Sequence, residues 1–241
     1  MLTLGSNLGT NTVKVSAGGI GQVVIFNAVA VPPLDIPDPN LRAAVENALN
    51  KSPGEPIAPE EMATLDWLTA YDANISDLTG LEHATNLTGL DLGNNTISDI
   101  TAVAGLTNLE SLDLGDNTIS DITAVAELTN LNYLFLYRND LSNISALSGL
   151  TNLKGLEVGA NQISDISALS GLTNLEWLKL LSNQISDISP LVANPGLGDG
   201  DEVDVIGNPL SYQSINTHIP ALQSRGVIVC LLYTSPSPRD S

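Results

Sequence analysis

The stretch LTGLDLGNNTISDITAVAGLTN, residues 87–108, decides the fold because it returns throughout the middle of the chain. A shift of 22 residues gives LESLDLGDNTISDITAVAELTN, further copies begin at Leu131, Leu153 and Leu175, and a weaker copy begins at Leu65. The shared skeleton is L-x-x-L-x-L-x-x-N-x-I-S-D-I-x-x-L-x-x-L-T-N. An unbroken period of this length indicates a solenoid in which each repeat adds one turn.

Each repeat predicts a short strand followed by a compact return segment. The L-x-L alternation, as in Leu90 and Leu92, is typical of a strand with one buried face. Apolar residues then follow at a spacing of three, from Ile97 to Leu106, which favours a 3₁₀-like segment over a full helix. One turn cannot bury its own leucines, but stacked turns share a core, and about seven turns give a parallel sheet roughly 30 Å long.

A polar residue closes each strand at one fixed position. A buried amide there can pair with backbone groups that a tight bend leaves free, which predicts a structural ladder of Asn95, Asn117, Asn139, Asn161 and Asn183. Ala73 holds this position in the first copy, so the ladder begins one turn later. The last member, Asn208, comes three residues late, which predicts an insertion near 198–202. The Asp of each ISD, or Asn143 in the fourth copy, can cap the return segment.

The 22-residue length and the ISDIS-x-L return segments resemble the internalin-like bacterial leucine-rich repeat proteins, over Ile36 to Val229. PDPNLRAAVENAL, residues 37–49, matches the cap that precedes such repeats. The resemblance implies an α/β leucine-rich repeat solenoid with a curved parallel β-sheet on its concave face, a 3₁₀ or irregular convex face and a helical N-terminal cap. It also implies a secreted or cell-surface protein.

The N-terminal flank divides into two parts. Residues 1–31 contain two β-rich runs, Thr12 to Ser16 and Gln22 to Ala30, which resemble the last two strands of a truncated immunoglobulin-like domain. Residues 32–64 form a proline-stiffened linker and the helical cap. There, Asp38-Pro39 predicts the start of a helix that continues to about Asn50, and residues 57–64 predict a second short helix.

The repeats, 65–210, end in an acidic loop, 198–204, that is either a solvated surface loop or a Ca²⁺ site. We favour the solvated loop, because no fixed ligand spacing is present. Residues 211–229 predict a C-terminal cap with a helix over 211–223 and a final strand. The tail CLLYTSPSPRDS, residues 230–241, resembles a translated sequencing adapter, so we expect it to be an artefact. It holds the only cysteine, Cys230.

Charge and motifs limit the classes of function. Eight Lys and Arg against 27 Asp and Glu give a net charge of −19, which argues against nucleic acid and anionic membranes as partners. The alternative is that the acidity only keeps a long exposed surface soluble. The sequence has no motif for a nucleophile, a nucleotide or a metal, and His83 and His218 cannot form a usual zinc set without cysteine. We therefore expect a non-enzyme without cofactor or metal.

The residues that flank each L-x-L are free of the core and project from the concave face. Six of the nine aromatic residues lie in these columns, where exposed rings are typical of recognition sites. The alternative is that the rings shield neighbouring strands from water. We expect one cluster of Tyr133, Phe135, Tyr137 and Arg138, with Trp177 and Lys179 two turns on. The other candidate ligand-binding residues are Trp67, Tyr71, Asp91, Asp113 and Glu157, with a glycine and aspartate strip that lets a ligand approach the backbone.

The sequence therefore predicts a bacterial, monomeric recognition module that binds a protein through its concave face. A structural spacer without a specific ligand and a carbohydrate-binding adhesin remain the alternatives.

Overall fold

The computed structural model describes residues 10–15, 24–29 and 32–231. In the N-terminal part, β1 (Thr10–Val15) and β2 (Val24–Val29) pair antiparallel, with Thr10 opposite Val29 and Val15 opposite Val24. The two predicted strands are therefore confirmed. The glycine-rich turn expected between them lies outside the described residues, and the immunoglobulin-like origin of this segment stays a prediction.

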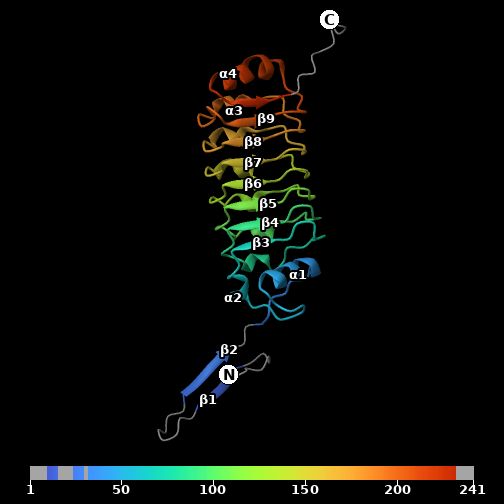
Figure 1. The fold of residues 1–241 in the computed structure, drawn as a ribbon, viewed down its shortest axis with the longest axis vertical. Helices are drawn as coiled ribbons and strands as arrows, with labels where there is room; N and C mark the ends of the chain where they lie inside the picture. Colours follow the sequence, from blue (N-terminus) through green and yellow to red (C-terminus); the bar gives the residue numbers. More distant parts are fainter. Residues whose placement is uncertain (1–9, 16–23, 30–31, 232–241) are drawn as a thin grey trace.

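The repeats form the predicted solenoid, a single parallel sheet whose strands follow one another in chain order (Figure 1). Register is constant at 22 residues from β3 to β8, so Leu68 lies beside Leu90 and Leu156 beside Leu178. The strands are β3 (Trp67–Thr69), β4 (Gly89–Asp91), β5 (Ser111–Asp113), β6 (Tyr133–Phe135), β7 (Gly155–Glu157), β8 (Trp177–Lys179), β9 (Glu202–Asp204) and β10 (Ile228–Cys230).

Short return segments form the face opposite the sheet. The predicted spacing of three produces 3₁₀ turns in five repeats and a brief α-helix, α3 (Ser189–Ala193), in the last. Leucines, isoleucines and valines from both faces meet in one continuous core, in which Leu112, Ile119 and Val125 are fully buried. The 3₁₀ segments are η1 (Leu81–His83), η2 (Thr101–Val103), η3 (Thr123–Val125), η4 (Ser145–Gly149) and η5 (Ser167–Gly171).

The asparagine ladder joins each turn to the next. Asn117 accepts a hydrogen bond from the Ile97 N–H (2.9 Å) and donates to the carbonyls of Leu92 (3.0 Å) and Leu114 (3.1 Å). The ladder starts at Asn95, which serves the N–H groups of Ala73 and Ile75 in the first copy. These bonds satisfy backbone groups that the bend leaves without partners.

The three-residue insertion before the last ladder position is also confirmed. Asn208 donates to the Leu180 carbonyl and accepts from the Ile185 N–H, so it performs the same role although it comes three residues late.

A second ladder, which the sequence analysis missed, runs along an exposed edge. The Asn of each L-T-N donates to a backbone carbonyl one turn back, as Asn130 does to Thr107 (2.8 Å). Its other members are Asn86, Asn108, Asn152 and Asn174. The repeated L-T-N was the sequence signal for this ladder.

The aspartates of ISD cap the return segments as predicted. Asp99 accepts the N–H of Thr101 (2.8 Å), and the same bond recurs at Asp165 with Ser167. These backbone hydrogen bonds lower the pKa of both carboxyl groups, because they favour the ionised form.

Two helices and a loop close the N-terminal end of the core. The helix α1 (Pro39–Ala48) begins at Pro39 with Asp38 as its N-cap, as predicted, and ends two residues before the expected Asn50. The helix α2 (Pro59–Met62) is shorter than the predicted segment 57–64. Asp38 is buried; one carboxylate oxygen accepts the N–H groups of Asn40 and Leu41, and the other accepts those of Ser76 and Asp77.

Asp38 therefore ties the cap to the first repeat, and acid should loosen this link. Burial alone would raise the pKa of Asp38, but the hydrogen bonds from Ser76, Leu41, Asp77 and Asn40 together lower it below its ordinary value of 3.8. A lowered pKa in the folded state means that the stabilisation is present above about pH 4 and is lost as the pH falls through the lowered pKa.

We expect Asp38→Asn to lower the free energy of unfolding by about 2 kcal/mol at pH 7 and to flatten its decline below pH 4. The amide keeps one acceptor but turns a donor toward the N–H groups of Ser76 and Asp77. Urea denaturation from pH 2.5 to 7 measures both effects, with the exposed Glu127→Gln as control. An acid limb equally steep in Asp38→Asn would contradict this role.

The C-terminal cap follows the prediction over 211–223 closely. A π-helical turn, Ser214–His218, leads directly into α4 (Ile219–Ser224), and β10 then extends the sheet. Cys230, which the sequence analysis assigns to the tail, is the last residue of β10. Residues 232–241 lie outside the described residues, so the origin of the tail stays a prediction. No helix in the described chain is long and apolar enough to cross a membrane.

Candidate functional site: the concave face of the sheet

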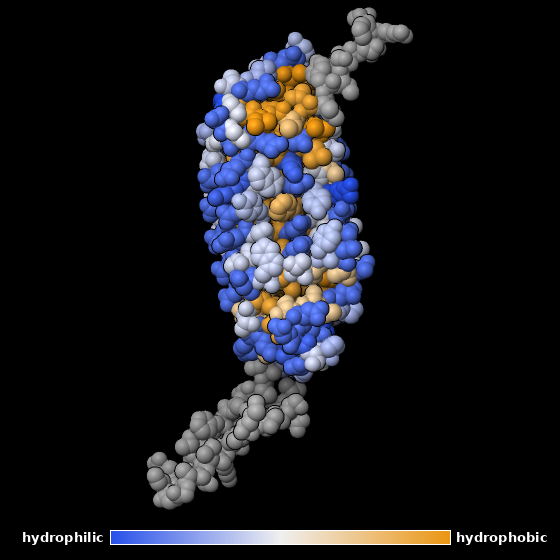
Figure 2. Space-filling view, in the orientation of Figure 1, coloured by the Kyte–Doolittle hydropathy of each residue, from blue (hydrophilic) through white to orange (hydrophobic). Residues whose placement is uncertain are grey.

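The predicted columns do project from the sheet, away from the leucine core. Trp67 and Tyr71 are each 53% exposed, and Tyr133 is 38% exposed, whereas Leu68 and Leu134 between them are buried. Figure 2 shows hydrophilic side chains along both sides of the repeats, a paler band over the strands and a hydrophobic patch near the C-terminal cap. The rings expected outside the core are therefore outside it.

Glycines on neighbouring strands provide the space in which the large side chains lie. A Cβ atom added to Gly89 would come within 1.9 Å of the Trp67 ring, and one added to Gly155 within 2.1 Å of the Trp177 ring. Tyr137 covers Gly115 in the same way. We expected a glycine and aspartate strip that lets a ligand approach the backbone. This prediction is wrong for the glycines. Side chains cover those glycines, and the glycines are buried.

The ring cluster, defined here as Tyr133, Phe135 and Trp177, joins side chains from β6 and β8 across β7. Trp177 stacks on Tyr133, with ring centroids 6.4 Å apart and planes 14° apart, and lies 5.7 Å from Phe135. The Lys179 Nζ is 5.7 Å from the Trp177 ring. Trp177 and Lys179 lie two turns on from β6, as predicted, but the Trp177 ring contacts the rings of β6 across the intervening strand. Gly155, on the strand between, has no side chain to keep Trp177 upright, so the ring reaches back across it.

Charged residues of the face fall into paired and unpaired sets. Arg138 contacts Asp116 at 3.3 Å, and Lys179 contacts Glu157 at 3.5 Å. Asp91 and Asp113 lie opposite each other in register on β4 and β5. Burial, and then the charges of Asp91 and Glu157, raise the pKa of Asp113 against the hydrogen bond that it accepts from Gly115.

The pKa of Tyr137 is raised by burial and by the acidic groups around it. Burial of its hydroxyl, followed by the nearby groups of Asp113, Tyr71, Asp116 and Glu157, raises the pKa of Tyr137 to about 12. Negative groups oppose a phenolate for the same reason that they would attract a cation.

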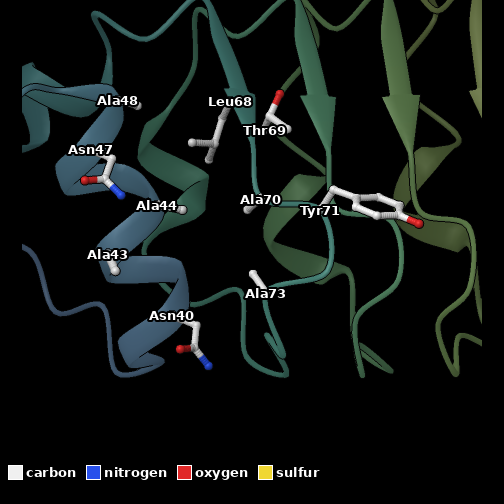
Figure 3. Close-up of a pocket in the computed structure, with 10 residues that line it drawn as sticks. All are labelled: Asn40, Ala43, Ala44, Asn47, Ala48, Leu68, Thr69, Ala70, Tyr71 and Ala73. Atoms are coloured by element: carbon white, nitrogen blue, oxygen red, sulfur yellow. The ribbon is translucent and has the colours of Figure 1, made fainter.

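A groove beside the first strand extends this face toward the cap. It has a volume of about 570 Å³ and lies between α1 and β3, with Asn40 and Asn47 on one side and Thr69 and Tyr71 on the other (Figure 3). Its floor is formed by small residues, including Ala44 and Ala70. The sequence analysis missed it. The alanines of α1 were the available signal, because small side chains keep a helix close to its neighbour without filling the space between.

The acidic loop forms contacts of its own. Asp201 accepts the N–H of Gly198 at 2.7 Å, so it closes the loop as an ordinary turn does. Within residues 32–231, no group of three or more His, Cys, Asp and Glu side chains is arranged to hold a metal ion. A solvated loop stays our prediction.

Substitution of a seating glycine should disperse the ring cluster. We expect Gly155→Ala to push Trp177 off β7, which separates it from Tyr133 and Phe135 and shifts its fluorescence emission to longer wavelength as the ring enters water. The unfolding free energy should fall by about 1 kcal/mol, the amount lost with an aromatic pair. Gly105→Ala, where an added Cβ would meet nothing within 4 Å, is the matched control. Unchanged emission in Gly155→Ala would contradict the seating.

Comparison with known proteins agrees with these features. A family model described as leucine rich repeats (2 copies) matches residues 85–127 and 129–171. Internalin C2 from Listeria monocytogenes is 32% identical, over 84% of this chain and 98% of that chain, with a TM-score of 0.62. Internalin F from the same species is 27% identical, over 85% of this chain and 67% of that chain, with a TM-score of 0.66. Among curated proteins, none matches.

Proposed function

The chain belongs to the internalin family of leucine-rich repeat proteins, and from this premise we propose that it is a non-catalytic module that binds a protein through its concave face. The leucine-rich repeat is a fold of protein interaction. We further propose that the module acts outside the cell or at its surface, as the family resemblance implies.

The observation that carries this proposal is the ring cluster, in which Tyr133 is exposed and Phe135 and Trp177 are half-buried. Trp177 stacks on Tyr133 and contacts Phe135 before any ligand arrives, so little side-chain entropy remains to be lost on binding. Binding energy in protein interfaces concentrates on Trp, Tyr and Arg at the centre of the contact. Arg138 lies three residues after the end of β6, the strand that carries Tyr133 and Phe135.

Shielding of the sheet accounts for less of this pattern. Rings that only covered glycines would be expected to lie mostly buried, yet Trp67 and Tyr71 each leave about half of their surface in solvent. Large exposed rings in one continuous face favour a partner.

The test replaces Tyr133, Phe135 and Trp177 together with serine. The wild type and the triple variant are screened against arrayed secreted and cell-surface proteins and against a glycan array. Tyr212→Ser, which removes an exposed ring from the C-terminal cap, is the matched control. We expect a protein ligand that the wild type and the control bind equally and the triple variant binds at least about 100-fold more weakly.

Other outcomes would overturn the proposal. Binding to glycans alone would indicate an adhesin, and no ligand at all would indicate a spacer between other domains. A protein ligand that the triple variant binds as well as the wild type would place the interface elsewhere. Circular dichroism of the triple variant checks that the solenoid is intact.

A further inference from the structure

Two carboxylates form a floor near the N-terminal end of the concave face. Asp91 and Asp113 are directly opposite each other on adjacent parallel strands, and such strands lie about 4.8 Å apart. Asp91 accepts the N–H of Gly93 at 3.2 Å, and Asp113 accepts that of Gly115 at 2.8 Å, so the backbone holds both carboxylates in place. Like charges opposite each other on a sheet are destabilising.

Neither carboxylate has a cation of its own in the described chain. The ion pairs on this face are Arg138 with Asp116 and Lys179 with Glu157. The described chain has no ion pair to Asp91 or Asp113. Both residues are nevertheless partly buried, so each carboxylate loses part of its hydration and gains one backbone hydrogen bond but no opposite charge.

Aromatic rings enclose the floor. Along β4, Asp91 lies between Gly89, which the Trp67 ring covers, and Gly93, which the Tyr71 ring contacts. Asp113 lies beside Gly115, which the Tyr137 ring covers, and opposite Phe135 in register. The face thus presents two carboxylates at the bottom of a shallow site with π surfaces around it.

We propose that the partner is a protein with a basic surface, which places an arginine side chain on Asp91 and Asp113 between these rings. This inference rests on the proposed function and specifies its partner. A guanidinium is planar, donates two parallel hydrogen bonds to carboxylates and stacks on aromatic faces, so it fits acids and rings together, whereas an ammonium fits chiefly the acids.

Charge complementarity extends beyond the floor. The chain has a net charge of −19, which attracts a basic partner over distance and repels an acidic one. A cation on the floor would also relieve the repulsion between Asp91 and Asp113. Burial raises the pKa of Asp113 most, and the charges of Asp91 and Glu157 raise it further.

The test uses three pentapeptides, acetyl-Gly-Gly-X-Gly-Gly-amide, in which X is arginine, lysine or citrulline. Citrulline has the shape of arginine without its charge. Each peptide is titrated into the isotopically labelled chain, and the indole N–H signal of Trp67, which donates to the Thr69 hydroxyl at 2.9 Å, reports binding. We expect the arginine peptide to bind with a Kd of order 1 mM, the lysine peptide more weakly and the citrulline peptide at least about tenfold more weakly.

Variants locate the binding on the floor. Asp91→Asn with Asp113→Asn should weaken the arginine peptide about tenfold or more. Glu60→Gln with Glu127→Gln removes the same charge from exposed positions elsewhere and should change the affinity less than twofold. The single variant Asp91→Asn repeats the test where the double variant is unstable, and it should show a smaller loss of the same sign.

The inference is overturned by an arginine peptide that leaves Trp67 unshifted at about 20 mM, by equal binding of the citrulline peptide, or by equal losses in the two double variants. These failures differ from a failure of the proposed function. A protein ligand that depends on Tyr133, Phe135 and Trp177 but not on Asp91 and Asp113 would keep the proposed function and remove the arginine site. If the chain bound the arginine peptide but no protein ligand, the arginine site would stand and the proposed function would fail.

Discussion

Replacing Asn117 with alanine should lower the free energy of unfolding by about 4 kcal/mol, one of the two largest effects expected of a single substitution here. The side chain is buried in the middle of the array. Alanine leaves the Ile97 N–H without a partner and away from water. It also removes one hydrogen bond each from the carbonyls of Leu92 and Leu114, which keep their bonds from Asn95 and Asn139. Because each turn contacts only its neighbours, the damage is local to β4, β5 and the turns beside them.

Asn130→Ala is the control, because it removes the same side chain from the exposed ladder in the same repeat. Its single bond to the Thr107 carbonyl is accessible to water, so we expect a loss of about 1 kcal/mol. Urea denaturation followed by circular dichroism measures both. Equal losses in the two variants would show that position along the array, rather than burial of the amide, sets the stability.

Replacing Arg225 with alanine should lower the free energy of unfolding by about 3 kcal/mol. Its guanidinium is partly buried and donates to the carbonyls of Val192 (2.9 Å), Asn194 (2.8 Å) and Leu197 (2.6 Å). Those carbonyls belong to the end of α3 and the loop that follows, so one side chain fastens the C-terminal cap to the last repeat.

Arg225→Lys should recover only part of this stability, because an ammonium on a flexible stem cannot reach three carbonyls in the same geometry. Lys154→Ala, an exposed cation in the fifth copy of the repeat, is the control for loss of charge and should change little. Amide exchange near Asn194 and Leu197 should accelerate in Arg225→Ala. If the alanine variant were as stable as Lys154→Ala, the cap would be held by its apolar contacts alone.

The repetitive part of the fold was predictable from the sequence because each position of the repeat recurs in several copies. The buried ladder illustrates this: counting from Asn183 predicted the late position of Asn208, and Asn208 makes the predicted bonds. The capping role of Asp38 was also predictable, since Asp followed by Pro begins helices for a local reason. That Asp38 also reaches Ser76 was not, because the contact joins distant parts of the chain.

The candidate site was predictable as a set of positions but not as an arrangement. Period and alternation placed Trp177, Tyr133 and Phe135 on one face. The direction in which a ring leans depends on which neighbour is glycine: Trp177 and Tyr137 lean back over the preceding strand, whereas Trp67 and Tyr71 lean forward over the following one. The groove between α1 and β3 was missed because it depends on how a helix outside the repeats packs against the first strand.

Rings seated on glycines form a prepared recognition face, and the chemical shifts of the glycine α-protons are the decisive test of this arrangement. We predict that the α-protons of Gly89 and Gly155 are shifted to low frequency by the rings of Trp67 and Trp177, relative to those of Gly105, which no side chain covers. The shifts should disappear separately in Trp67→Leu and Trp177→Leu. Shifts at Gly89 and Gly155 that match those of Gly105 would contradict the account.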